Sequence, residues 1–246
     1  MAKRAKNTAK NNRQQTRERT QDPTKNHFEL KKIEPLTENQ ETAFESYEDG
    51  KNVILHGYAG TGKTYISLFL ALEEVLSGFS NYDKIVIVRS VVPSRDIGFL
   101  PGSIKEKIQV YEEPYREICN DLFGRGDGYD VLKMKGLVHF TTTSFLRGLT
   151  FNNAIVIVDE LQNMTFPELD TVMTRMGNQS KIMFCGDFRQ TDLASDKDKS
   201  GIVHFMNITK KMNSFDYVEF GKQDIVRSGL VKEYIIKRTE MEDKAA

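Results

Sequence analysis

Eight consecutive residues, from Gly57 to Thr64, match the pattern G-x-x-x-x-G-K-[ST] in full. Glycines permit a tight loop whose backbone amides point inward, and the N-terminus of the next helix adds positive potential. A loop of this kind holds nucleotide phosphates, with its lysine at the β- and γ-phosphates and its last hydroxyl on Mg²⁺. We therefore expect Lys63 to act in binding and catalysis and Thr64 to be a metal ligand. The residues expected to hold the nucleotide are Gly57, Tyr58, Ala59, Gly60, Thr61, Gly62, Lys63, Thr64 and Tyr65.

A pair of acidic residues, Asp159 and Glu160, follows the apolar run 154–158. Carboxylates at the carboxyl end of a buried strand lie where α/β folds place their ligands. We expect Asp159 to hold the hydration shell of Mg²⁺ and Glu160, as a catalytic residue, to polarise a water molecule for attack on the γ-phosphate. Activation of water indicates hydrolysis and disfavours a small-molecule kinase, which must exclude water. Two exposed acids at an ordinary strand end are the alternative.

A third element, residues 185–193, also follows an apolar run. Its neutral amide, Gln190, is a catalytic candidate because it would contact the γ-phosphate or the attacking water and so report which nucleotide is bound. Taken alone, the segment has the composition of an ordinary turn.

Short apolar runs recur between helical stretches along the chain, and they predict the fold class. The runs lie at 51–56, 85–88, 137–143, 154–158, 182–185 and 215–220, and a helix is predicted over 65–76. Continuous apolar runs suit strands that are covered on both faces, and strands that alternate with helices predict a parallel sheet. We therefore expect an α/β fold, a P-loop NTPase with a parallel sheet flanked by helices.

Residues 93–135 interrupt this pattern. A loop-like stretch comes first, followed by an amphipathic helical segment over 103–123 and a glycine-rich break over 124–128. We expect a helical and loop excursion from the sheet here, with few apolar residues of its own.

The chain of 246 residues has no net charge, but its first 26 residues hold eight basic and two acidic side chains. Such a polar segment cannot bury enough surface to fold alone, so we expect a disordered basic tail over 1–27 that is either solvated or bound to a phosphate backbone. Residues 241–246 are expected to be disordered as well. Two cysteines far apart, no signal core and no membrane-length apolar run indicate a cytoplasmic protein without a membrane partner.

Taken in order, these motifs resemble those of the PhoH family of P-loop ATPases, whose core is related to the first motor domain of superfamily 1 helicases. The resemblance runs over roughly residues 36–236. Its most specific elements are G-F-L-P-G at 98–102 and D-E-L-Q-N at 159–163, where Leu161 replaces the usual alanine. Further matches lie at 37–40, 88–92, 146–150, 186–193 and 224–231. The stretch 90–94 departs from the common form of the family.

The resemblance implies a RecA-like ATPase domain over 28–240 that binds ATP with Mg²⁺ and hydrolyses it. It implies that Gln40 reads the adenine base, and that the chain is the single-domain form found in tailed bacteriophages, acting in the host cytoplasm. It also implies that Arg227, beyond the last strand, serves as a catalytic arginine finger for a neighbouring subunit. The protein would then be a homo-oligomeric ring, most simply a hexamer. A surface salt bridge is the alternative role for Arg227.

The leading hypothesis is therefore an ATPase coupled to nucleic acid, either RNA or single-stranded DNA. The excursion offers cations and aromatic rings of the kind that neutralise and stack on single strands. These are Lys105, Lys107, Arg116, Arg125, Lys133 and Lys135, with Phe99, Tyr111, Tyr115 and Tyr129. The alternative is a nucleotide-switched oligomeric assembly protein without motor activity.

Overall fold

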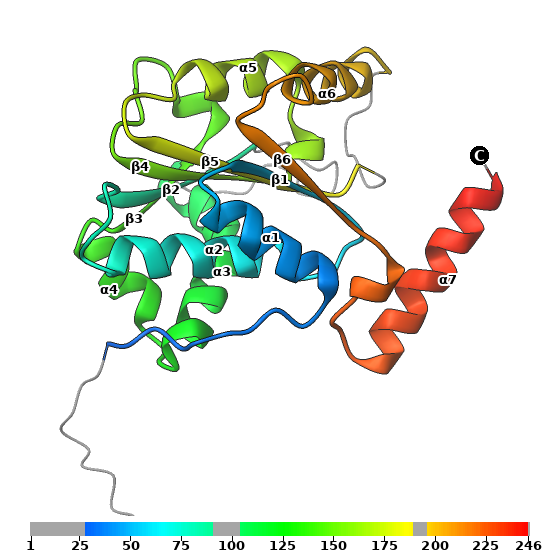
Figure 1. Ribbon diagram of the computed structural model, residues 1–246, viewed down its shortest axis with the longest axis horizontal. Helices are drawn as coiled ribbons and strands as arrows, with labels where there is room; N and C mark the ends of the chain where they lie inside the picture. The colour runs from blue at the N-terminus through cyan, green and yellow to red at the C-terminus, as the bar shows by residue number, and fades with distance from the viewer. Residues whose placement is uncertain (1–27, 91–103, 189–195, 246) are drawn as a thin grey trace, which may run out of the picture.

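The computed structural model of the chain describes residues 28–90, 104–188 and 196–245. Among these residues a sheet of six strands crosses the middle of the molecule, with helices on both faces (Figure 1). The strands are β1 (Asn52–Gly57), β2 (Lys84–Arg89), β3 (Val138–Thr142), β4 (Ala154–Asp159), β5 (Ser180–Gly186) and β6 (Phe215–Phe220). Their order is β3-β2-β4-β5-β1-β6, and every pairing is parallel. The predicted parallel α/β sheet is confirmed.

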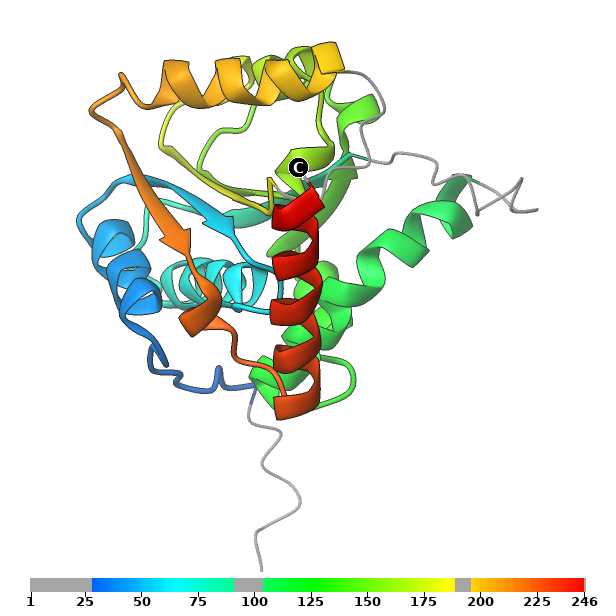
Figure 2. The ribbon, with the colours of Figure 1, turned by 90° about the vertical axis from the view of Figure 1, so that its right-hand side faces the viewer.

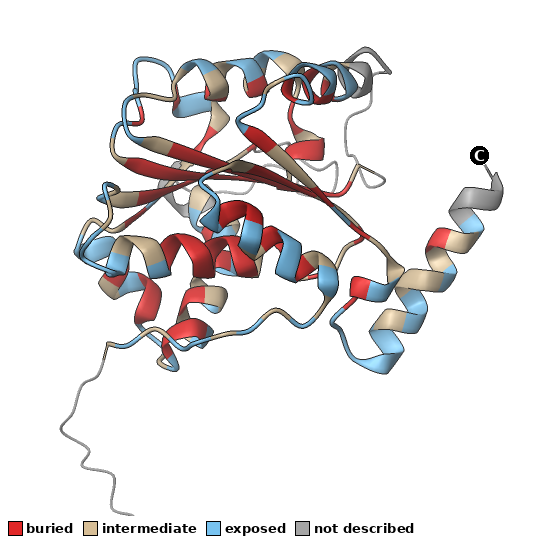
Figure 3. Ribbon diagram, in the orientation of Figure 1, coloured by how far each residue is buried: buried red, intermediate tan, exposed pale blue. Residues whose placement is uncertain are grey.

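The strands form where apolar, β-branched runs can be buried on both faces of the sheet. All six residues of β4 are buried, and the four central residues of β2 are buried too. Figure 3 shows that burial is concentrated in the sheet and in the helices packed directly on it. This pattern is expected for a parallel sheet inside a three-layer fold.

Helices cover the two faces of the sheet unequally. One face carries α1 (Glu38–Glu48), α2 (Lys63–Leu76), α3 (Ile104–Phe123) and α4 (Gly128–Met134), and the other carries α5 (Phe166–Thr174) and α6 (Asp196–Thr209). Three short 3₁₀ turns lie at Thr143–Phe145, Leu161–Asn163 and Lys222–Asp224. None of the helices in the described part of the chain is long and apolar enough to cross a bilayer.

The last helix, α7 (Gly229–Ala245), stands at one side of the molecule, beyond the end of β6 (Figures 1 and 2). It continues past residue 240, where we expected the folded domain to end. Over 229–241 only Thr239 is buried, whereas eight residues of α2 are buried (Figure 3).

The helical segment predicted within 93–135 is present as α3, with α4 after it. These helices pack more closely on the core than expected, because Tyr115, Cys119 and Leu122 form a stripe at helical spacing that is fully buried. Tyr129 of α4 is fully buried beside them. The first turns of α3 project from the body of the molecule, as Figure 2 shows.

The strand order brings the carboxyl ends of β1, β5 and β4 together at one edge, with β5 in the middle. Adjacent strands are about 4.8 Å apart, so the ends of β1 and β4 lie about 10 Å from each other. Open parallel sheets bind ligands outside their carboxyl ends. The elements that carry the predicted phosphate loop and acidic pair therefore converge on one edge of the sheet.

Candidate nucleotide site

The loop between β1 and α2 has the backbone conformation that its glycines predict. Gly60 and Gly62 have φ values of 75° and 84°, in the left-handed region. Gly57 has a φ of 119°, and a Cβ atom there would lie 2.1 Å from the carbonyl oxygen of Phe220. The amide of Tyr58 donates to that same oxygen across 3.1 Å. Gly57 and Tyr58 therefore fix the base of the loop against β6, and 59–65 form its open side.

Positive potential is concentrated at the start of α2. The helix begins at Lys63 directly after the loop, and its first turn has no acidic side chain to offset the exposed amides. The Lys63 ammonium donates to the carbonyl oxygens of Gly57, at 2.9 Å, and Tyr58, at 2.7 Å. Burial lowers the pKa of Lys63, although nearby carboxylates such as Asp187 act in the opposite direction. Because the contacting oxygens are neutral, the ammonium charge remains available to an anion.

The predicted metal-binding pair is assembled by the ends of α2 and β4. The Thr64 hydroxyl donates a hydrogen bond to one carboxylate oxygen of Asp159 across 2.9 Å. The other oxygen of Asp159 accepts a hydrogen bond from the hydroxyl of Tyr115, also across 2.9 Å. Asp159 is thus oriented from both sides at the carboxyl end of its strand.

Glu160, the predicted base, has a strained backbone. Its φ of 54° and ψ of 43° lie in the left-handed region, which non-glycine residues adopt rarely and mostly at functional sites. Burial and then the neighbouring charge of Asp159 raise the pKa of Glu160, whereas Arg89, Gln162 and Lys63 act to lower it. A carboxylate with a raised pKa accepts a proton more readily than an ordinary one.

Gln162 links Glu160 to the end of β5. Its amide group donates to the carboxylate of Glu160, and its carbonyl oxygen accepts from the backbone amide of Asp187 across 3.0 Å. Gly186 leaves room for this contact, because a Cβ atom there would lie 2.6 Å from the side-chain oxygen of Gln162. The ends of β4 and β5 are therefore connected through one buried amide side chain.

A cleft of about 500 Å³ lies over these groups. Seven consecutive residues of the phosphate loop and the helix start, from Ala59 to Tyr65, line it. The other lining residues are Arg89, Pro114, Glu117, Ile118, Asp159, Glu160, Gln162, Gly186, Asp187 and Arg227. Gln190 lies outside the described residues.

Arg227 lies beside the phosphate loop of its own chain. The amide of Val226 donates to the carbonyl oxygen of Gly60 across 3.0 Å, which fixes the segment after β6 on the loop. A Cβ atom on Gly60 would lie 2.8 Å from the Cγ atom of Arg227. The side chain is exposed and lines the cleft. Arg227, which we expected to act at the site of a neighbouring subunit, therefore borders the site of its own chain.

Gln40 is packed behind the phosphate loop. It is only 3% exposed. Its amide group donates to the carbonyl oxygen of Thr61 across 2.9 Å, and its carbonyl oxygen accepts from the amide of Leu36 across 2.8 Å. A second cavity of about 440 Å³ adjoins these contacts. It is lined by Ile33, Glu34, Leu36, Gln40, Gly60, Gly62, Tyr65, Ile66, Val226 and Arg227.

Tyr65 borders both cavities and is tied to the far end of α3. Its hydroxyl donates to the carboxylate of Asp121 across 2.7 Å. The same carboxylate accepts from Lys31 in the segment that leads into α1. Tyr65 therefore forms part of the wall between the loop and α3.

Two of the four aromatic residues that we expected to contact single-stranded nucleic acid are buried in the described structure. Tyr115 and Tyr129 are fully buried, so neither ring can stack on a base. Three of the expected cations pair with acids, Arg116 with Asp130, Arg125 with Asp127, and Lys133 with Glu112. Phe99 and the side chains of Lys105 and Lys107 lie outside the described residues. Tyr115 and Tyr129 therefore belong to the core of the described structure.

Several side chains at the site were not predicted as site residues, among them Arg89, Asp187, Gln162 and Tyr115. Arg89 is the last residue of β2 and Asp187 directly follows β5, so the rule that places ligands at the carboxyl ends of parallel strands could have indicated them. Gln162 belongs to the D-E-L-Q-N motif but has no acid or base chemistry of its own. Tyr115 gave no local signal, because its partner Asp159 lies 44 residues away.

A family model described as PhoH-like protein matches residues 32–238. The PhoH-like protein of Bacillus subtilis (strain 168) is 34% identical over 180 residues, which cover 73% of this chain and 55% of that protein. Protein PhoH of Escherichia coli (strain K12) is 34% identical over 185 residues, covering 74% and 51% respectively. The chain thus spans little more than half the length of these relatives.

Among solved structures, the fold resembles that of the large terminase from a thermophilic bacteriophage. The TM-score is 0.50 at 13% identity, and the match covers 82% of this chain and 50% of that one. At this identity the likeness shows a common fold and nothing more.

Proposed function

The chain belongs to the PhoH-like protein family, and from this premise we propose that it is a Mg²⁺-dependent ATPase whose turnover is coupled to RNA or single-stranded DNA. The observation that carries the proposal is the convergence of Lys63, Thr64, Asp159 and Glu160 in one cleft of about 500 Å³. Family membership implies a P-loop NTPase. The proposed coupling to nucleic acid rests on other residues.

The residues at the end of β4 fit Mg²⁺. The hydroxyl of Thr64 and the carboxylate of Asp159 are hard oxygen donors that lie 2.9 Å apart. In the described part of the chain no group of three or more His, Cys, Asp or Glu side chains forms a metal cage. Mg²⁺ commonly uses one or two protein oxygens together with substrate phosphates and water. When bound, it supplies neutralisation of phosphate charge.

The chain's own residues then divide the work of hydrolysis. The loop amides and Lys63 hold and neutralise the phosphates. The carboxylate of Glu160 accepts a proton from water as the water oxygen bonds to the γ-phosphorus, and the bond from that phosphorus to the bridging oxygen of ADP breaks. Gln162 holds Glu160 in place by its hydrogen bond. Arg227, beside Gly60, is placed to offset developing charge from within the same chain.

We assign the adenine base to the second cavity. Its lining is largely apolar, with Ile33, Leu36 and Val226 facing it together with the ring of Tyr65. Since both ends of the Gln40 amide already contact backbone groups, this side chain shapes the cavity and supports the loop. Adenine would then be held mainly by packing and by the ring of Tyr65.

Coupling to nucleic acid is supported by two exposed residues after β3. Phe145 is 52% exposed, and Arg147 is exposed two residues further on. They follow the carboxyl end of β3, and the cleft also lies at the carboxyl ends of the parallel strands. An aromatic ring beside a cation suits stacking on bases and contact with phosphates. The basic segment over 1–26 adds six positive charges in excess.

A second candidate, the nucleotide-switched assembly, is supported by α7. This helix exposes Leu230, Tyr234 and Met241, at 80%, 64% and 73%. Its neighbour Arg227 borders the cleft, so a second copy of the chain packed on α7 would sense the nucleotide. We propose a homo-oligomer, a hexameric ring in the simplest case, that acts in the cytoplasm, where the two free thiols, Cys119 and Cys185, would stay reduced.

One experiment separates the candidates. ATP turnover is measured with and without single-stranded RNA or DNA, for the wild type and for Phe145→Ala, while light scattering gives the mass in solution with and without ATP. Stimulation by nucleic acid that Phe145→Ala reduces, with basal turnover unchanged, supports the coupled ATPase. A nucleotide-dependent mass with turnover indifferent to nucleic acid supports the assembly. No turnover by the wild type under any condition would contradict the enzyme.

A further inference from the structure

Tyr115 makes the most specific contact between the site and a helix outside the phosphate loop. Its hydroxyl donates to Asp159 across 2.9 Å, opposite the Thr64 hydroxyl, which donates to the other carboxylate oxygen. The side chain is fully buried, so water does not compete for the contact. Asp159 is therefore held by α2 on one side and by α3 on the other.

The hydroxyl of Tyr115 is fixed as a donor by its surroundings. Burial and then the charge of Asp159 raise the pKa of Tyr115 well above its ordinary value. Arg89 at the end of β2 interacts electrostatically with Tyr115, and its guanidinium lies 5.7 Å over the ring of Tyr111. Since an ionised carboxylate can only accept, the hydroxyl of Tyr115 is the donor in its contact with Asp159.

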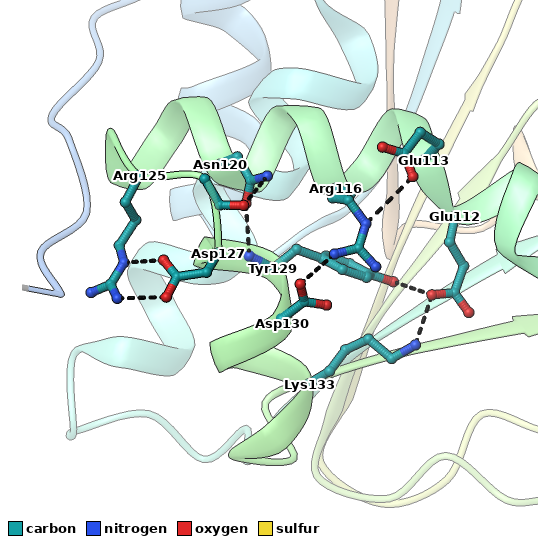
Figure 4. A network of polar contacts seen from close by, with 10 residues as sticks. Glu112, Glu113, Arg116, Asn120, Arg125, Asp127, Tyr129, Asp130 and Lys133 are labelled. Atoms are coloured by element: carbon teal, nitrogen blue, oxygen red, sulfur yellow. Dashed lines mark hydrogen bonds and ion pairs between the residues drawn. The ribbon is translucent and has the colours of Figure 1, made fainter.

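On its other side, α3 is fastened to α4 by a network of polar contacts (Figure 4). Glu112 accepts hydrogen bonds from Lys133, at 2.7 Å, and from the hydroxyl of Tyr129, at 3.2 Å. Arg116 pairs with Asp130 across 2.5 Å, and its guanidinium lies 5.2 Å over the ring of Tyr129. The ion pair of Arg116, the residue after Tyr115, with Asp130 of α4 holds the helix turn that carries Tyr115.

We propose that Tyr115 is a positioning residue for Asp159, holding its carboxylate in the orientation that a Mg²⁺–nucleotide complex requires. This inference rests on the proposed nucleotide site and names a residue that acts through Asp159 without touching the nucleotide. Partners in the second layer of metal sites commonly change metal affinity by about 10-fold to 100-fold when they are removed.

The test is the binding of the fluorescent nucleotide mant-ADP at increasing Mg²⁺ concentration, for the wild type, Tyr115→Phe and Tyr129→Phe. Tyr129 is a matched control, because it is equally buried and its hydroxyl also donates to a carboxylate. That carboxylate belongs to Glu112 of α3 and does not line the cleft. We expect Tyr115→Phe to raise the Mg²⁺ concentration for half-maximal binding by about 10-fold or more. Affinity in EDTA should stay unchanged, and Tyr129→Phe should match the wild type.

A cycle with Asp159→Asn checks that Tyr115 acts through Asp159. In that background, Tyr115→Phe should add no further shift in Mg²⁺ dependence. A Tyr115→Phe curve identical to that of the wild type, or equal shifts in both tyrosine variants, would contradict the role of Tyr115 and leave the proposed function intact. Failure of the wild type to bind mant-ADP at any Mg²⁺ concentration would overturn the proposed function, and this inference with it.

Discussion

The side-chain amide of Gln40 donates a hydrogen bond to the carbonyl oxygen of Thr61 across 2.9 Å, joining the start of α1 to the phosphate loop. Thr61 is fully buried, so water does not compete with Gln40 for this carbonyl oxygen. The same amide accepts from Leu36. Because Gln40 contacts both the segment before α1 and the phosphate loop, it stabilises the loop before any nucleotide is bound.

Gln40→Ala should therefore lower stability as well as nucleotide affinity. The loss of a buried contact to Thr61 is expected to cost about 1–3 kcal/mol of unfolding free energy without nucleotide, measured by urea denaturation. Gln109→Ala is the control, because Gln109 is an exposed glutamine of α3. An unchanged unfolding free energy, together with a changed preference between ATP and GTP, would show that Gln40 reads the base instead.

Gly186→Ala should reduce turnover through Gln162. A Cβ atom at 186 would lie 2.6 Å from the side-chain oxygen of Gln162, which would have to move away from Asp187 and Glu160. We expect kcat to fall about 10-fold or more, because Glu160 loses its orienting partner. Gly126→Ala is the matched control, since no atom lies within 4 Å of a Cβ atom there. Equal kcat values for both variants would contradict a role for Gln162.

The limits of prediction from sequence follow from these contacts. The phosphate loop, its flanking strand and helix, and the acid at the end of β4 are each specified by residues within a few positions of one another. The contacts of Gln40, Tyr115 and Arg227 instead depend on how distant segments pack, which a local pattern does not contain. The stripe of Tyr115, Cys119 and Leu122 shows the same difficulty, because helical spacing does not say whether a face is buried or exposed.

Glu160→Gln should stabilise the protein at neutral pH. Burial and Asp159 raise the pKa of Glu160 in the folded state, so its ionised form disfavours folding. The protonated carboxyl of Glu160 contributes its full stability below the pKa that the group has in the unfolded chain. This contribution is lost as pH rises through the higher pKa that it has in the folded protein. We therefore expect the Tm of Glu160→Gln to exceed that of the wild type by a few degrees at pH 7. The difference should shrink as pH falls below the folded pKa, and a lower Tm at pH 7 would contradict the buried-charge argument.

Arg227→Ala should lower kcat within its own subunit. Because Arg227 lies beside Gly60 of the same chain, mixing Arg227→Ala subunits with Glu160→Gln subunits should restore no activity. An arginine that served a neighbour would pair with an intact Glu160 in some mixed sites. Recovery of turnover on mixing, measured by phosphate release, would therefore show that Arg227 acts between subunits.

In the proposed reaction, Glu160 activates water for ATP hydrolysis in a site held by Lys63, Thr64 and Asp159. The most direct measurement compares phosphate release from ATP by the wild type and by Glu160→Gln, with ATP binding measured for both at the same Mg²⁺ concentration. We predict that Glu160→Gln binds ATP as tightly as the wild type and releases phosphate about 100-fold or more slowly. Equal rates of phosphate release by two variants that both bind ATP would contradict the account.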